Sequence, residues 1–222
     1  THEVFNQARA LEDYNAYDND TALREAVARH GAGWAEDALS AHGARTGSAE
    51  VIEWGFLANE HKPQFFSHDR QGYRVDLVKY HESYHRLMAL GLESGMHSSP
   101  WANPKPGAHV ARAAQSYLQA QVDAGHGCPL TMTFASVPSI SLTPALAKEW
   151  LPKILNNAYD PRNVPHTEKQ ALTIGMGMTE KQGIALERGV FQYGFGGFFA
   201  VVSAVAAAWY PARKAAQVRP VD

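Results

Sequence analysis

Apolar residues recur at helical spacing along most of the chain. The longest such stripe lies between Pro106 and Gly125 and predicts a helix over residues 108–124. Its members are Val110, Ala113, Ala114, Tyr117, Leu118 and Val122. A shorter stripe of the same kind predicts a helix over residues 81–92, with Tyr84, Leu87, Met88 and Leu92 on one face.

Start and stop signals predict three further helices, over residues 20–29, over residues 48–60 and from about residue 143 onward. Asp20 is a suitable N-cap residue for the first of them. Pro144 suits the first turn of the last one, because its missing N–H would be unpaired there in any case.

The pattern changes near Gln170. Residues 156–170 carry two prolines together with Asn, Asp and His, and are expected to form a loop. Residues 171–178 combine strand-forming residues with glycines and predict a first β-strand. The chain is therefore predicted to be mainly α, with a helical domain over residues 1–170, the start of a β domain over 171–183, and a separate tail over 184–222.

Residues 189–210 form an uncharged, largely apolar stretch of 22 residues. About 20 apolar residues suffice to span a bilayer, and the basic residues that follow Pro211 would stay on the cytoplasmic side. A core helix buried on all sides would give the same pattern, and the glycines in the stretch weaken the membrane interpretation.

Composition sets limits on the function. The formal net charge of −2 gives no electrostatic footprint for nucleic acid or an anionic membrane. The single cysteine, Cys128, excludes an internal disulfide, and the first residues do not resemble a secretory signal. A cytoplasmic protein is expected.

One string matches a zinc motif. His81, Glu82 and His85 satisfy H-E-x-x-H, which on one helix face can bind zinc and supply a general base. The extended form of the motif fails, because Met88 and Gly91 stand where a glycine and a third histidine are required. A chance match on an ordinary helix is the competing interpretation.

Cys128 could be a nucleophile activated by His126. Two residues of separation rarely aim side chains at each other, so a small buried hydrophobic role is favoured for this cysteine.

Several strings taken together resemble one family. They are Ala32-Gly33-Trp34, Gly55 to Asn59, His81 and His85 before Leu87-Met88, Pro106 to Ala114, Gln121 to Gly125, Cys128 to Phe134, and Gly175 to Gly183. In this order, over about residues 4–183, they are similar to the N-terminal half of the AidB-type (adaptive response) branch of the acyl-CoA dehydrogenase family.

The resemblance implies a flavoenzyme with helical, β and helical domains, normally a tetramer, that oxidises CH–CH groups of acyl-CoA and holds FAD between the β domain and the helices. Carried over to this chain, it makes Met178, Thr179, Glu180 and Gly183 the flavin-contacting residues. Residues 130–134 would face the flavin and the acyl group. A protein hydrogen bond near the flavin ring tunes the electronics of the cofactor, which performs the hydride transfer.

The chain departs from the family after Gly183. Ile184-Ala-Leu stands where the family continues Gly-Ser-Asp. The rest of the β domain and the C-terminal domain are not recognisable, and with them the catalytic carboxylate and the basic surface that such proteins use for DNA. We therefore assign no catalytic residue, and expect weak or no FAD binding and no dehydrogenase turnover.

The tail has a resemblance of its own. Tyr210 to Ala216 and Val218 to Asp222 are similar to the C-terminal end of FtsX/MacB-type transporter permeases, where a last membrane helix precedes a basic segment. A gene fusion, an assembly error or a remnant would each join the two parts. Three hypotheses follow: a truncated FAD-dependent acyl-CoA dehydrogenase, a helical binding module anchored to a membrane by residues 189–210, and a zinc hydrolase using His81, Glu82 and His85.

Overall fold

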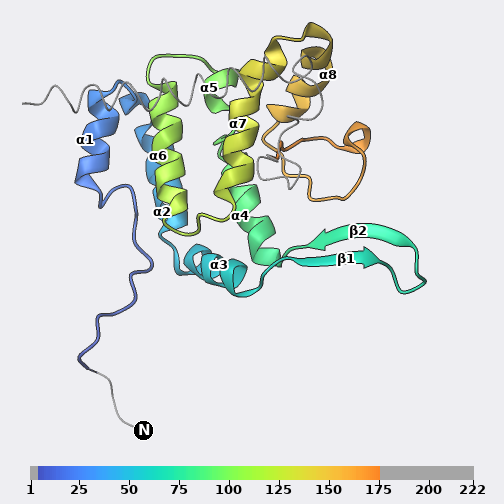
Figure 1. Cartoon of the computed structure of the whole chain (residues 1–222). Helices are drawn as coiled ribbons and strands as arrows, with labels where there is room; N and C mark the ends of the chain where they lie inside the picture. Colours follow the sequence, from blue (N-terminus) through green and yellow to red (C-terminus); the bar gives the residue numbers. More distant parts are fainter. Residues whose placement is uncertain (1–4, 176–222) are drawn as a thin grey trace, which may run out of the picture. The chain divides into compact units, whose positions relative to one another are not determined.

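The fold was analysed in a computed structural model, which describes residues 5–175 (Figure 1). These residues belong to the first of two compact units, Thr1–Met176. The predicted mainly α fold is confirmed. The α-helices are α1 Thr21–Arg29, α2 Glu36–Thr46, α3 Ala49–Glu60, α4 Glu82–Glu93, α5 Ser99–Ala102, α6 Ala108–Ala120, α7 Gly127–Ser141 and α8 Pro144–Ile154, and short 3₁₀ helices cover Gly33–Ala35 and His166–Glu168.

Three small cores hold the helices together. In the first, Val27 of α1, Leu39 of α2 and Leu118 of α6 are fully buried around Tyr17. In the second, α4 packs on α7. The third joins α7 to α8 through Val137 and Ile154. Members of the second and third cores are Met88, Leu92, Met96 and Leu130, and Val137, Ile154 and Leu172.

Local capping explains why the predicted helix starts are accurate. The Asp20 carboxylate accepts a hydrogen bond from the Leu23 N–H at 2.9 Å, and Ser48 caps α3 through the Val51 N–H. Pro144 occupies the first turn of α8, as predicted.

Helix α6 ends at Ala120, four residues before the predicted end. The Asp123 carboxylate accepts the backbone N–H of His126, so residues 121–126 turn the chain into α7 instead of extending α6. Helix α7 then takes up the apolar residues 130–137.

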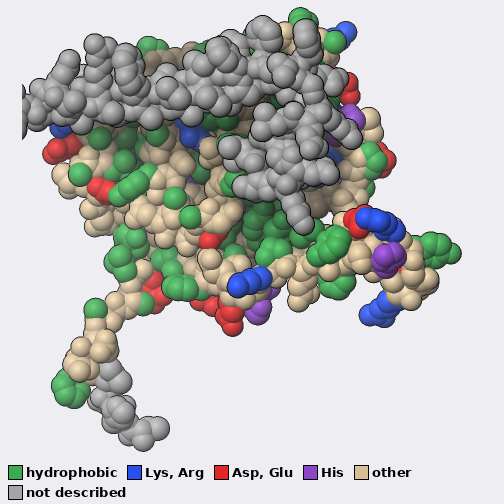
Figure 2. Space-filling model, in the orientation of Figure 1, with side chains coloured by type: hydrophobic (Ala, Val, Ile, Leu, Met, Phe, Trp, Pro, Cys, Tyr) green, Lys and Arg blue, Asp and Glu red, His purple; other side chains and the backbone are tan. Residues whose placement is uncertain are grey.

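A β-hairpin, which the sequence patterns did not reveal, projects from the helices between α3 and α4 (Figure 1). Its strands are β1 Gln64–His68 and β2 Arg74–Lys79, paired antiparallel. Asp69 and Gly72 form the turn, with the glycine at φ +86°. Apolar side chains occupy both faces of the ribbon and remain exposed, and this two-sided pattern lacks the alternation of a half-buried strand. Figure 2 shows hydrophobic side chains at the surface on the face of the hairpin that it displays.

Residues 171–175, predicted as the start of a strand, form no strand in the described part of the chain. They pack instead along α7 and α8: the Leu172 N–H donates to the Lys153 carbonyl, and the Ile174 N–H donates to Thr133 Oγ1. The remainder of that predicted strand lies outside the described residues. Within residues 5–175, no helix has both the length and the apolarity needed to cross a membrane.

Candidate functional site

An open groove of about 690 Å³ runs from the base of the hairpin to Gly175, the last described residue. We call it the Gly175 groove. Its lining is partly apolar and partly charged. The apolar residues include Met88, Pro129 and Ile174, the basic ones are Lys79, Arg162 and Lys169, and the acidic ones are Asp76 and Asp160, of which Asp160 pairs with Arg162.

The wall of the Gly175 groove contains a partly buried hydrogen bond that the sequence did not indicate. His85 Nδ1 lies 2.7 Å from the Tyr159 hydroxyl, and the ring of Tyr84 stacks on that of Tyr80 at a centroid separation of 4.2 Å. Burial raises the pKa of Tyr84 to about 12 and also raises that of Tyr159. Both phenols therefore keep their protons at neutral pH. The spacing of Tyr80 and Tyr84 in the sequence could have indicated that these two rings lie together. The contact with Tyr159 could not be foreseen in this way, because Tyr159 lies in a loop 75 residues after Tyr84.

Thr133 connects the predicted flavin-facing residues 130–134 to the groove. Its hydroxyl donates to the Pro129 carbonyl at 2.6 Å and accepts the Ile174 N–H at 2.9 Å, and the residue is fully buried. Helix α7 thus holds the segment that leads directly into residues 178–183. Met178, Thr179, Glu180 and Gly183 themselves lie outside the described residues, as does the tail 184–222 with its predicted apolar helix.

The zinc interpretation is not supported. Helix α4 begins at Glu82, so His81 is its N-cap residue and does not share a helix face with His85. The His81 Nδ1 accepts the Ser83 N–H, and its ring stacks on His61. His85 is engaged with Tyr159. Across residues 5–175, no group of three or more potential metal ligands is found.

The His126 ring is not available to activate the Cys128 thiol. Its Nδ1 lies 2.8 Å from the Asp123 carboxylate, and its Nε2 lies 2.7 Å from the amide nitrogen of Gln119. Burial lowers the pKa of His126 more than its contact with Asp123 raises it, so the ring is neutral at pH 7. Cys128 is exposed, so its predicted buried role is wrong.

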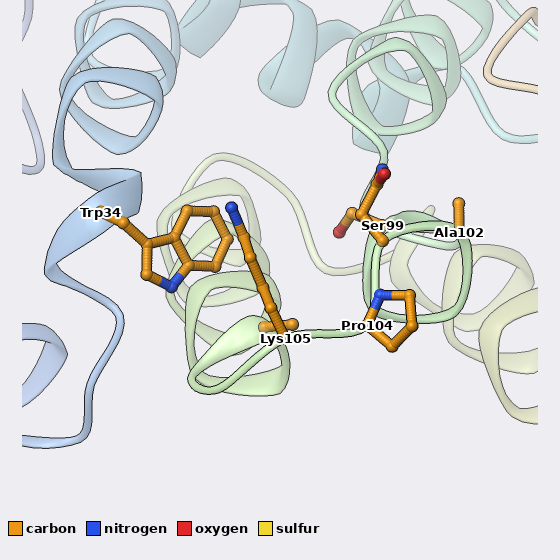
Figure 3. Close-up of a pocket in the computed structure, with 7 residues that line it drawn as sticks. Trp34, Ser99, Ala102, Pro104 and Lys105 are labelled. Carbon is orange, nitrogen blue, oxygen red and sulfur yellow. The ribbon is translucent and has the colours of Figure 1, made fainter.

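A second depression, of about 520 Å³, lies between Trp34 and α5 (Figure 3). The Lys105 ammonium lies 3.3 Å from the centroid of the Trp34 ring, and the indole N–H donates to the Pro106 carbonyl. The Lys105 side chain runs along the indole, facing Ser99 and Pro104 across the opening (Figure 3). In this depression, the Lys105 ammonium therefore already occupies the aromatic face of Trp34.

Comparisons with known proteins agree with the arrangement of the helices. The profile of the adaptive response protein AidB N-terminal domain matches residues 6–161. A protein of Escherichia coli named as an acyl-CoA dehydrogenase, AidB, is 45% identical over 185 residues, which cover 82% of this chain and 34% of that protein.

Two solved structures share the fold at 22% identity. Bd2924 in its apo form gives a TM-score of 0.65 over 79% of this chain and 34% of its own. Caenorhabditis elegans ACDH-11, in complex with C11-CoA, gives 0.64 over 82% and 31%. The chain thus spans about a third of the length of these relatives. With a family profile over most of its described residues and a relative of high identity, the chain belongs to the AidB-type acyl-CoA dehydrogenase family.

Proposed function

We propose that this chain forms the helical side of the flavin and acyl-CoA site of an AidB-type, FAD-dependent acyl-CoA dehydrogenase. The flavin contacts are Met178, Thr179, Glu180 and Gly183. The reaction class is oxidation of a CH–CH bond of an acyl thioester, in which the flavin, when bound, accepts the hydride.

The observation that carries this proposal is the extent of the similarity to the E. coli protein. Because that similarity covers 82% of a 222-residue chain, it necessarily includes residues 178–180. Met178, Thr179 and Glu180, to which we assign the flavin contact, are therefore part of the similar segment and not an isolated match.

The Gly175 groove fits the chemistry of these ligands. Gly175 precedes Met178 by three residues, and three residues span at most about 11 Å. Lys79 and Lys169 line the groove and would suit the diphosphate that FAD and coenzyme A both carry, while Met88 and Ile174 offer an apolar wall to a ring or an acyl chain.

The same reasoning limits the expected activity. Ile184 and the residues after it replace the Gly-Ser-Asp that follows the flavin string in the family. We therefore expect this chain to bind FAD weakly and to show no acyl-CoA-dependent bleaching of the flavin. The tetramer and the DNA binding implied by the family stay predictions.

The test is the visible absorbance of the purified chain titrated with FAD, compared with two threonine-to-valine variants. Thr179→Val removes the hydroxyl assigned to the flavin, whereas Thr21→Val makes the same change at an exposed position of α1, outside the residues expected to face the flavin. We expect weak binding that Thr179→Val weakens further and Thr21→Val does not change. Equal FAD affinity in both variants would contradict the flavin assignment, and bleaching by an acyl-CoA would contradict the expected inactivity.

A further inference from the structure

A second pocket, of about 360 Å³, lies beside the start of α4, opposite the end of α3 and the connection between α6 and α7. It shares Tyr80, Tyr84 and Pro129 with the Gly175 groove. We call it the Asp123 pocket. Its polar and aromatic lining consists of Asn59, His61, Tyr80, His81, Tyr84 and Asp123. Its size falls within the range of small-molecule sites.

The Asp123 pocket carries a net negative charge. Asp123 is the one carboxylate among the described residues that line it, and neither lysine nor arginine is among them. The carboxylate is hydrogen-bonded by neutral groups: Asn59 donates to Oδ1 at 2.7 Å, and the His126 ring, which is neutral at pH 7, donates to Oδ2. Burial would raise the pKa of Asp123, but these hydrogen bonds outweigh it and lower the pKa. The negative charge is therefore retained.

Two stacked ring pairs contribute to the walls of the Asp123 pocket. Tyr80 and Tyr84 stack with centroids 4.2 Å apart, and His61 and His81 stack at 4.5 Å. Aromatic faces attract cations through the quadrupole of the ring, and a nearby carboxylate adds a direct Coulombic attraction.

The hydrogen bonding of Asp123 selects the kind of cation. Oδ1 already accepts from Asn59, and Oδ2 accepts from both the ring and the backbone N–H of His126. The carboxylate thus offers charge but few free lone pairs. A cation without N–H donors suits this arrangement better than a primary ammonium, which requires acceptors for three hydrogens. We infer that the Asp123 pocket binds a small ligand with a quaternary ammonium group.

The depression at Trp34 provides an internal contrast. Lys105 already covers that indole with its own ammonium (Figure 3), so a second cation would be repelled there. An exposed aromatic ring alone therefore does not predict a cation site. A quaternary ammonium compound is expected to bind in the Asp123 pocket and not at Trp34.

The test is a ligand-observed NMR titration of the full chain with choline, run at about pH 8 to keep imidazoles unprotonated. The neutral comparison compound is 3,3-dimethylbutan-1-ol, which has the same shape with carbon in place of the charged nitrogen. Tyr80→Ala removes an exposed aromatic face, and Tyr80→Phe keeps that face while removing the hydroxyl. Asp123→Asn removes the charge. Neither ligand requires FAD, so the outcome is independent of the proposed function.

We expect choline to bind at least tenfold more tightly than the alcohol. Tyr80→Ala should weaken choline binding about two- to fivefold, Tyr80→Phe should not change it, and Asp123→Asn should weaken it at least tenfold. Because Tyr80 is exposed, its variants keep the test valid even if Asp123→Asn fails to fold. Equal binding of the two compounds, indistinguishable Tyr80 variants, or no binding of choline at concentrations on the order of 100 mM would overturn the inference.

Discussion

The contact between α7 and the segment before the flavin string can be tested by one isosteric change. Thr133→Val removes the hydroxyl that donates to the Pro129 carbonyl and accepts the Ile174 N–H, with little change in volume. A net hydrogen bond is worth about 1 kcal/mol, and an orphaned buried donor costs about 1–3 kcal/mol. Because Ile174 is only half-buried, water can partly replace the lost acceptor. We therefore expect a loss of about 1–2 kcal/mol in the free energy of unfolding.

Urea unfolding followed by circular dichroism measures this loss, and hydrogen exchange at the Ile174 amide shows where it acts. In a chain of this size, 1 kcal/mol lowers Tm by about 2–4 °C. The matched control is Thr21→Val, at an exposed position of α1 where the hydroxyl makes no hydrogen bond with a described residue. Equal midpoints in the two variants, or unchanged exchange at Ile174, would refute the anchoring role of Thr133.

Three further perturbations follow from the packing. Burial lowers the pKa of His42 to about 4. The neutral side chain therefore contributes its full stabilisation above the unfolded pKa of 6.5, and about 3 kcal/mol of unfolding free energy is lost as the pH falls towards 4. Urea midpoints measured against pH should fall less steeply in His42→Gln. Gly55→Ala places a methyl group against the backbone carbonyl of the α6–α7 connection and should cost about 1–3 kcal/mol by urea unfolding, whereas Gly33→Ala meets open space and should not. Tyr159→Phe loses the 2.7 Å contact with His85 and should lower the unfolding free energy by about 1 kcal/mol, with an unchanged value contradicting the contact.

Helix starts could be predicted from the sequence because their signals are local. Asp20 and Ser48 cap the helices that immediately follow them, and Pro144 begins α8 where expected. Each of these residues acts within three or four positions of itself, so no knowledge of the tertiary structure is needed to interpret it.

Features that depend on distant contacts could not be predicted in the same way. The end of α6 is decided by Asp123, which bonds forward to His126 and across to Asn59 on α3. The hairpin was missed because apolar residues occupy both of its faces, with Phe65 opposite Val78 and Phe66 opposite Leu77. A two-residue period appears in a sequence only when one face is buried and the other is not.

The H-E-x-x-H string shows why spacing does not by itself define a site. The motif requires both histidines inside one helix, where positions i and i+4 share a face. In this chain the helix begins one residue later, at Glu82, because the His81 imidazole accepts the Ser83 N–H in the manner of an N-cap. A shift of one residue at a helix boundary thus moves His81 from a ligand position to the edge of the Asp123 pocket. The same residue type then supplies an aromatic face, which is why the structure favours an organic cation over a metal ion at this end of α4.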